Sequence, residues 1–76
     1  MKDLLLYIAQ NLVDNPEQVQ VTERDEGDEI VFELRVAPGD MGKVIGRYGK
    51  IAKEIRVLMR SVAQKMGKRV SVDIVD

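Results

Sequence analysis

The chain of 76 residues is long enough for one small domain and too short for two hydrophobic cores. It contains neither cysteine nor histidine, which excludes a disulfide framework, thiolate or imidazole metal ligands, and the most common general base of enzymes. A hydrophobic content of 45% is sufficient for a core, so the composition also excludes an intrinsically disordered chain.

The formal net charge of −1 conceals two oppositely charged parts of the chain. Residues 1–40 carry 3 basic and 10 acidic side chains, whereas residues 41–70 carry 9 basic side chains and 1 acidic one. Two halves of opposite charge can simply attract each other within a fold. The interpretation that we favour is that the basic stretch faces a polyanion.

The first half of the chain predicts one helix and a β-hairpin. Apolar residues at helical spacing indicate a helix over about residues 2–13, which Asn15-Pro16 ends. Alternation of apolar and polar residues over 18–22 and over 30–36 predicts two strands, the second with one apolar and one mostly wet face. The turn signal at residues 26–28 lies between them, so the two strands should pair as a hairpin.

The second half predicts two helices and a final strand. Asp40 is placed to accept hydrogen bonds as the N-cap of a short helix over residues 41–45, and residues 46–49 interrupt the helical pattern. A longer helix begins at Lys50 and ends before Gly67. Its expected buried face consists of Ile51, Ile55, Leu58, Val62 and Met66, with Lys53, Arg56, Arg60 and Gln64 pointing largely away from it.

Residues 70–74 alternate again and close the chain with a strand. The element order α-β-β-α-α-β predicts a single α+β domain over residues 1–76. Because each strand is apolar on one face, helices should cover one side of a three-stranded sheet. The long crossover through two helices permits a parallel pair of strands, so we expect a mixed sheet.

The segment from Val44 to Ile55 is the most informative part of the chain. Two glycines three residues apart make a tight connection between two helices, where free N–H groups and the positive end of a helix dipole suit a phosphate. Arg47 adds a planar donor fork suited to phosphate oxygens. The candidate contacts are Lys43, Ile45, Gly46, Arg47, Tyr48, Gly49, Lys50, Ile51 and Lys53, in which the isoleucines supply apolar walls for a base.

The segment Val44-Ile45-Gly46-Arg47-Tyr48-Gly49-Lys50-Ile51-Ala52-Lys53-Glu54-Ile55 resembles the signature of KH domains, in which a G-x-x-G loop clamps about four nucleotides of a single strand. The element order is similar to the type II arrangement, and the resemblance covers the whole chain. It implies binding of single-stranded RNA and a homodimer. It also implies pairing with a larger KH-containing protein of the Jag (KhpB) family in the control of cell growth and shape. Tyr48 departs from the pattern, because a polar residue is expected there.

Two other interpretations remain open at this stage. A protein-interaction adaptor with little RNA contact would be favoured by an exposed apolar patch of Val57, Met59 and Val62 on the long helix. An enzyme has almost no support, because the chain offers no plausible nucleophile–base pair. We expect no cofactor and no metal, and Tyr7 should be partly buried in the core.

The apolar run from Leu4 to Ala9 is much shorter than the roughly 20 residues of a membrane span. The first residues also lack the basic leader and small-residue cleavage site of a secretory signal. We therefore expect a cytoplasmic protein.

Overall fold

The computed structural model describes residues 1–75. The first half consists of α1 (Lys2–Leu12), a short 3₁₀ helix η1 (Pro16–Gln18) and a hairpin of β1 (Gln20–Asp25) and β2 (Glu29–Arg35). The second half consists of η2 (Pro38–Asp40), α2 (Met41–Ile45), η3 (Arg47–Gly49), α3 (Lys50–Lys65) and β3 (Arg69–Val75). This order confirms the predicted α+β class.

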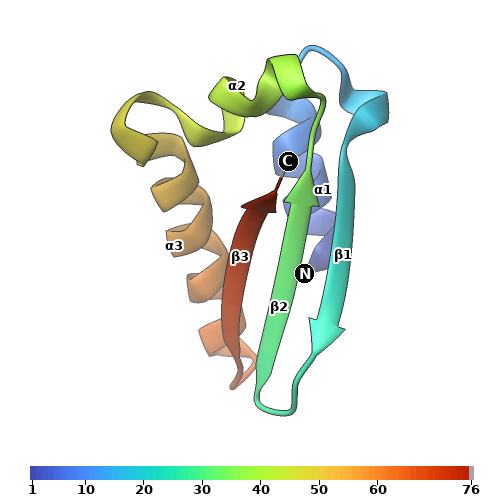
Figure 1. Cartoon of the computed structure of the whole chain (residues 1–76). Coiled ribbons are helices and arrows are strands. Elements are labelled where there is room, and N and C mark those ends of the chain that lie inside the picture. Colours follow the sequence, from blue (N-terminus) through green and yellow to red (C-terminus); the bar gives the residue numbers. More distant parts are fainter. Residues whose placement is uncertain (76) are drawn as a thin grey trace.

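The three strands form one mixed sheet in the order β1-β2-β3. β1 pairs antiparallel with β2, and β2 pairs parallel with β3, as the long crossover predicted. Figure 1 shows the helices together on one face of this sheet, with α3 running beside β3. The loop between α2 and α3 therefore lies near the edge of the sheet that β3 forms, at the far side from β1.

The hydrophobic core lies between the sheet and the helices. Phe32 and Leu34 of β2, Leu5 of α1, Val44 of α2 and Met59 of α3 are fully buried in it. The strand residues in this set follow the predicted alternation, because successive side chains of a strand point to opposite faces. The core thus holds α2 and α3, which flank the loop, against the sheet.

One residue on the opposite face of β2 departs from the prediction. Val31 was placed on the wet face, and the structure buries it to 5% exposure outside the main core. It lies on the central strand, in register with Arg24 of β1 and Ser71 of β3. The neighbouring strands on both sides shield a central position, even where no helix covers the sheet.

The predicted buried face of α3 is correct for Ile55, only partly buried at Ile51 and Val62, and wrong for Leu58 and Met66. The structure buries Ala52, Ile55, Met59 and Ala63, while Leu58 remains 45% exposed and Met66 lies beyond the last helical residue. The period is helical, as predicted, but the buried stripe is shifted around the helix. Two alanines lie on this stripe, and their small side chains permit a close approach of the helix to its neighbours.

The predicted N-cap role of Asp40 is also wrong in one respect. Asp40 does precede α2, but its side chain makes no capping hydrogen bond to that helix. Its carboxylate instead accepts hydrogen bonds from the backbone N–H groups of Asp14 and Asn15, at 3.2 and 3.0 Å, and from Asn15 Nδ2 at 3.1 Å. Asp40 therefore ties the loop that follows α1 to the start of α2.

The hydrogen bonds of Asp40 decide its charge state although it is only 1% exposed. Burial by itself would raise the pKa of this carboxyl. Hydrogen bonds from Asn15 and from the two backbone N–H groups, together with the charge of Lys43, outweigh burial and lower the pKa of Asp40 below its ordinary value. The carboxylate is therefore ionised near neutral pH.

No helix within residues 1–75 is both long and apolar enough to cross a bilayer.

Candidate nucleic-acid interface

Gly46 occupies a backbone conformation that only glycine adopts readily, with φ 77° and ψ 177°. A Cβ atom at this position would lie 2.7 Å from Cγ1 of Ile51, which is too close for a real contact. Two independent features therefore require glycine at position 46: its dihedral angles and the side chain of Ile51 packed against it. This packing holds the start of α3 close to the end of α2.

Tyr48 and Gly49 turn the chain into α3 through left-handed conformations, with φ of 56° and 72°. Nothing lies within 4 Å of the place where a Cβ of Gly49 would be, so only its dihedral angles favour glycine there. Tyr48 is the one residue other than glycine with positive φ within residues 1–75. Its side chain is nevertheless fully exposed. A bulky residue in this region is strained, and strain of this kind concentrates at binding sites.

The loop leaves fewer N–H groups free than the sequence predicted. The N–H groups of Gly46, Gly49 and Lys50 donate to the carbonyl oxygens of Gly42, Gly46 and Arg47 respectively. Among residues 1–75, no carbonyl or side-chain acceptor is found for the N–H groups of Arg47 and Tyr48. The loop therefore presents two free donors at its tip.

Ile45 and Ile51, the two predicted apolar walls, are partly buried and pack against the core. They flank the loop on the sides of α2 and α3. The side chains of Arg47, Lys50 and Lys53 are exposed. The structure thus brings apolar side chains and exposed cations together at this end of the molecule, and their contact with a base stays a prediction.

The cations from the loop to Arg60 have no acidic partners among the residues that the structure describes. Within residues 1–75, no carboxylate lies within 4.0 Å of the charged nitrogen atoms of Arg47, Lys50, Lys53, Arg56 or Arg60. Elsewhere, Arg24, Lys43, Lys68 and Arg69 all form ion pairs. If the two halves of the chain simply attracted each other, the acidic half would neutralise these cations. Along α3 it does not, over residues 1–75.

Lys43 differs from the other predicted contacts. Its Nζ atom lies 3.3 Å from Oδ2 of Asp14 and 3.8 Å from Oδ1 of Asp40. The ammonium group thus belongs to the cluster that joins the loop after α1 to α2. A contact between Lys43 and a nucleic acid would compete with these two ion pairs.

A groove runs between α3 and the edge of the sheet at β3. Arg56, Arg60 and residues 70–73 line a hollow of about 170 Å³ in it. Arg56 crosses the groove, because its Nε donates to the backbone carbonyl oxygen of Val72 at 3.0 Å. The second wall of this hollow is β3, the edge strand of the sheet, which runs beside α3 in Figure 1.

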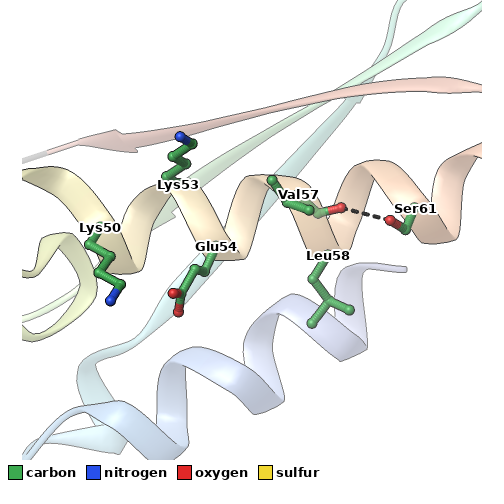
Figure 2. Close-up of a pocket in the computed structure, with 6 residues that line it drawn as sticks. All are labelled: Lys50, Lys53, Glu54, Val57, Leu58 and Ser61. Atoms are coloured by element: carbon green, nitrogen blue, oxygen red, sulfur yellow. Dashed lines mark hydrogen bonds between the residues drawn. The ribbon is translucent and has the colours of Figure 1, made fainter.

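A different, apolar surface lies on the other side of α3. One hollow of about 450 Å³ has Val57 and Leu58 in its lining, and a second of about 360 Å³ lies between α3 and α1. In Figure 2, Leu58 and Glu54 extend toward α1, whereas Lys53 extends on the side of the strands. We call the exposed Leu12, Val57 and Leu58, together with the partly buried Ile8 and Ile51 beside them, the apolar strip.

The apolar strip replaces the patch that the sequence predicted. Met59 is completely buried, so it cannot form an exposed patch with Val57 and Val62. Tyr7, which was expected to be partly buried, is 66% exposed on α1. Helical spacing placed Leu58 in the core, but alanines of α3 occupy the buried positions and leave Leu58 exposed. These alanines are the signal in the sequence that could have corrected the prediction.

Comparisons with known proteins agree with this geometry. Residues 2–74 match the family described as KhpA/KhpB, KH domain. The chain is 53% identical to the RNA-binding protein KhpA of Clostridium acetobutylicum, over 99% of this chain and 100% of that protein. It is 47% identical to the RNA-binding protein KhpA of Halalkalibacterium halodurans, over 100% of both chains.

The RNA-binding protein KhpA of Aquifex aeolicus is 42% identical, over 100% of this chain and 96% of that protein. No solved structure matches the chain. The α-β-β-α-α-β order and the glycine loop between α2 and α3 are the features that carry the resemblance to KH domains. On the fold, the loop and these full-length similarities, the chain belongs to the KhpA/KhpB family of KH domains.

Proposed function

We propose that this protein binds single-stranded RNA, with the phosphates held at the loop of residues 46–49 and the bases directed into the groove beside β3. The observation that carries the proposal is that, over residues 1–75, two N–H groups without an acceptor coincide with cations without a carboxylate partner. Relatives at 42% to 53% identity are named RNA-binding proteins, which supports the same function here.

Each part of the loop has a distinct role in this proposal. The N–H groups of Arg47 and Tyr48 donate to phosphate oxygens, and the guanidinium of Arg47 adds a charge-assisted contact. Lys50 and Lys53 attract the RNA strand by their positive charge. Gly49 keeps the approach to the backbone open, Gly46 lets Ile51 pack beneath the loop, and Ile45 and Ile51 support a base.

The binding should be modest in affinity and sensitive to salt. Neutralising about two to four phosphates of a single strand gives a slope of about −0.7 per phosphate in a plot of log K against log salt. A module that reads about four bases has limited sequence specificity. Any strong preference for a particular RNA would therefore require a second module.

A homodimer is the simplest source of that second module. The apolar strip leaves Val57 and Leu58 48% and 45% exposed, and burying these side chains against a second copy would remove them from water. Two loops on one particle would raise the overall affinity for a long RNA through effective concentration. Pairing with a larger KH protein of the Jag (KhpB) family, in the control of cell growth and shape in the cytoplasm, is the corresponding heterodimer that the family resemblance implies.

The experiment that tests RNA binding reverses the charge of the loop tip. The double variant Arg47→Asp and Tyr48→Asp should lose at least about tenfold in affinity for a short single-stranded RNA, because two carboxylates would face the phosphates. Fluorescence anisotropy measures the affinity, and circular dichroism checks the fold. A control with the same change in net charge, Lys2→Asp with Gln10→Asp on exposed positions of α1, should retain binding.

A protein-interaction adaptor is the second candidate function, and the apolar strip is the observation that favours it. The same pair of variants separates the two functions. If the loop variant keeps the fold and binds RNA as well as the unmodified protein, the RNA proposal is wrong. Both functions predict that Leu58→Glu changes the oligomeric state, so the RNA affinity of the loop variant is the measurement that separates them.

A further inference from the structure

The groove beside β3 does not end at the hollow near Arg56. A second hollow of about 330 Å³ continues it toward the end of α3, and its lining consists of Glu29, Arg60, Gln64, Lys68, Arg69 and Val70. Arg60 and Val70 line both hollows. The two are therefore adjacent parts of one channel that follows α3 and β3 over most of their length.

The side of α3 that faces this channel is set by helical spacing. Arg56, Arg60 and Gln64 are four residues apart, so they lie one above another on the same face. From Lys50 at the loop to Arg60, ten residues of helix span about 15 Å. A strand held at the loop would thus reach Arg60 only after passing the hollow at Arg56.

The cations at the far end of the channel are either free or weakly held. Arg60 has no carboxylate partner within residues 1–75. Lys68 lies 3.9 Å from Asp25, and Arg69 lies 3.1 Å from Asp28, both carboxylates coming from the end of the β1–β2 hairpin. The Arg69–Asp28 pair is more than 70% exposed on both sides, and exposed pairs contribute little to stability.

We infer that the second hollow is a further phosphate-binding site, in which Arg60, Lys68 and Arg69 hold the part of an RNA strand that extends beyond the loop. This inference rests on the proposed function. The footprint on RNA is then longer than the about four nucleotides that a G-x-x-G loop clamps. Asp28 competes with RNA phosphates for Arg69, and the negative charge of Glu29, which also lines the hollow, repels them. These two carboxylates at the end of the β1–β2 hairpin therefore limit the affinity of the hollow for RNA.

The test compares a labelled tetranucleotide with a labelled octanucleotide of the same base. Arg60→Gln should reduce octanucleotide affinity by about tenfold, which is what one charge-assisted hydrogen bond contributes, and leave tetranucleotide affinity unchanged. The salt slope for the octanucleotide should become shallower by about 0.7. Lys65→Gln, an exposed lysine outside both hollows, is the matched control and should change neither affinity.

A second substitution, which should strengthen RNA binding and not weaken it, sharpens the test. Asp28→Asn removes the charge that holds Arg69 and preserves the backbone carbonyl that accepts a hydrogen bond from the N–H of Arg69. It should strengthen octanucleotide binding about twofold to threefold and leave tetranucleotide binding unchanged. A purely structural role for Asp28 would not raise affinity for the longer RNA alone.

The possible outcomes separate this inference from the proposed function. If the unmodified protein binds neither RNA, the proposed function itself is wrong. If it binds both and Arg60→Gln weakens neither, or weakens both equally, the second site does not exist as described. Octanucleotide affinity that is unchanged in Asp28→Asn would also contradict the competition at the hairpin end.

Discussion

The β1–β2 turn and the α2–α3 loop both contain glycines with positive φ, and they differ in whether the charged side chains around them are paired. In the β1–β2 turn, the N–H of Gly27 donates to Oδ1 of Asp25, the N–H of Glu26 donates to the carbonyl oxygen of Glu29, and Asp28 pairs with Arg69. In the α2–α3 loop, the N–H groups of Arg47 and Tyr48 have no acceptor among residues 1–75.

In the α2–α3 loop the free donors lie beside exposed cations that have no carboxylate partner among residues 1–75, whereas the cation at the β1–β2 turn is paired with Asp28. Free polar donors at an exposed loop are hydrated and can exchange water for phosphate oxygens, whereas satisfied donors offer nothing to a partner. The exposed Tyr48 adds a strained backbone that the β1–β2 turn does not contain. Glycine alone therefore does not mark a candidate binding loop, and it is the exposed cations without carboxylate partners among residues 1–75 that distinguish the α2–α3 loop.

The largest expected effect comes from Gly46→Ala, which should lower the free energy of unfolding by about 3 kcal/mol because it combines a glycine-only conformation with a clash against Ile51. Gly49→Ala, which meets no neighbour, should cost only about 1 to 2 kcal/mol. Urea unfolding measures both. Equal losses in the two variants would mean that the packing of Ile51 does not matter.

Asp40 should produce the next largest effect, and it depends on pH. Its folded-state pKa lies below the ordinary value of 3.8, so its contribution to stability is complete above that value and is lost as the pH falls through the folded pKa. Asp40→Asn should therefore be less stable than the unmodified protein at pH 7, and the difference should shrink in acid. Denaturant unfolding at pH 7 and below pH 3.8 measures it. A difference independent of pH would contradict the assigned ionisation.

Tyr48→Asn should separate binding from stability. Asparagine tolerates the left-handed region, so the variant should be more stable by about 0.5 to 1 kcal/mol. RNA affinity should fall at least about fivefold if the ring stacks on a base, since such stacking contributes about 1 to 3 kcal/mol per base. Tyr48→Phe retains the ring and should retain the affinity. Loss of affinity in both variants would assign the contact to the hydroxyl group instead.

The smallest effect is expected in the β1–β2 turn. Glu26→Gln removes the exposed ion pair with Arg24, at 3.3 Å, and should change stability by less than about 0.5 kcal/mol. Arg24 retains its second ion pair with Glu33 at 2.9 Å. RNA affinity should not change, because the side chain lies outside both hollows. A large loss of stability would show that the ionic network of the hairpin folds cooperatively.

Several features of the molecule were predicted correctly because they depend on local patterns. The element order follows from the helical and strand periods of apolar residues, and the glycines of residues 46–49 and the turn at Gly27 mark the connections. The mixed sheet followed from the length of the crossover. The position of the candidate loop was likewise evident, since two glycines between two helical patterns leave few alternatives.

The candidate site was predicted only in part. The residues of the loop were identified, but the pattern could not distinguish the two free N–H groups from the three that donate to nearby carbonyls. Lys43 and Lys50 look alike in the sequence, and only the folded chain brings Asp14 and Asp40 to one of them. The residues of the second hollow come from β2, α3 and β3, which no local motif connects.

By itself the sequence determined the secondary structure, the class of fold, the place of the loop and the concentration of positive charge after residue 40, because each depends on residues close to one another in the chain. The tertiary structure decided which cations are paired, which N–H groups are free and which face of α3 is buried. Asp40 and the two residues that bind it are 25 and 26 positions apart. Such partners are chosen by the packing of α1, α2 and α3 on the sheet, which brings distant residues within hydrogen-bond distance.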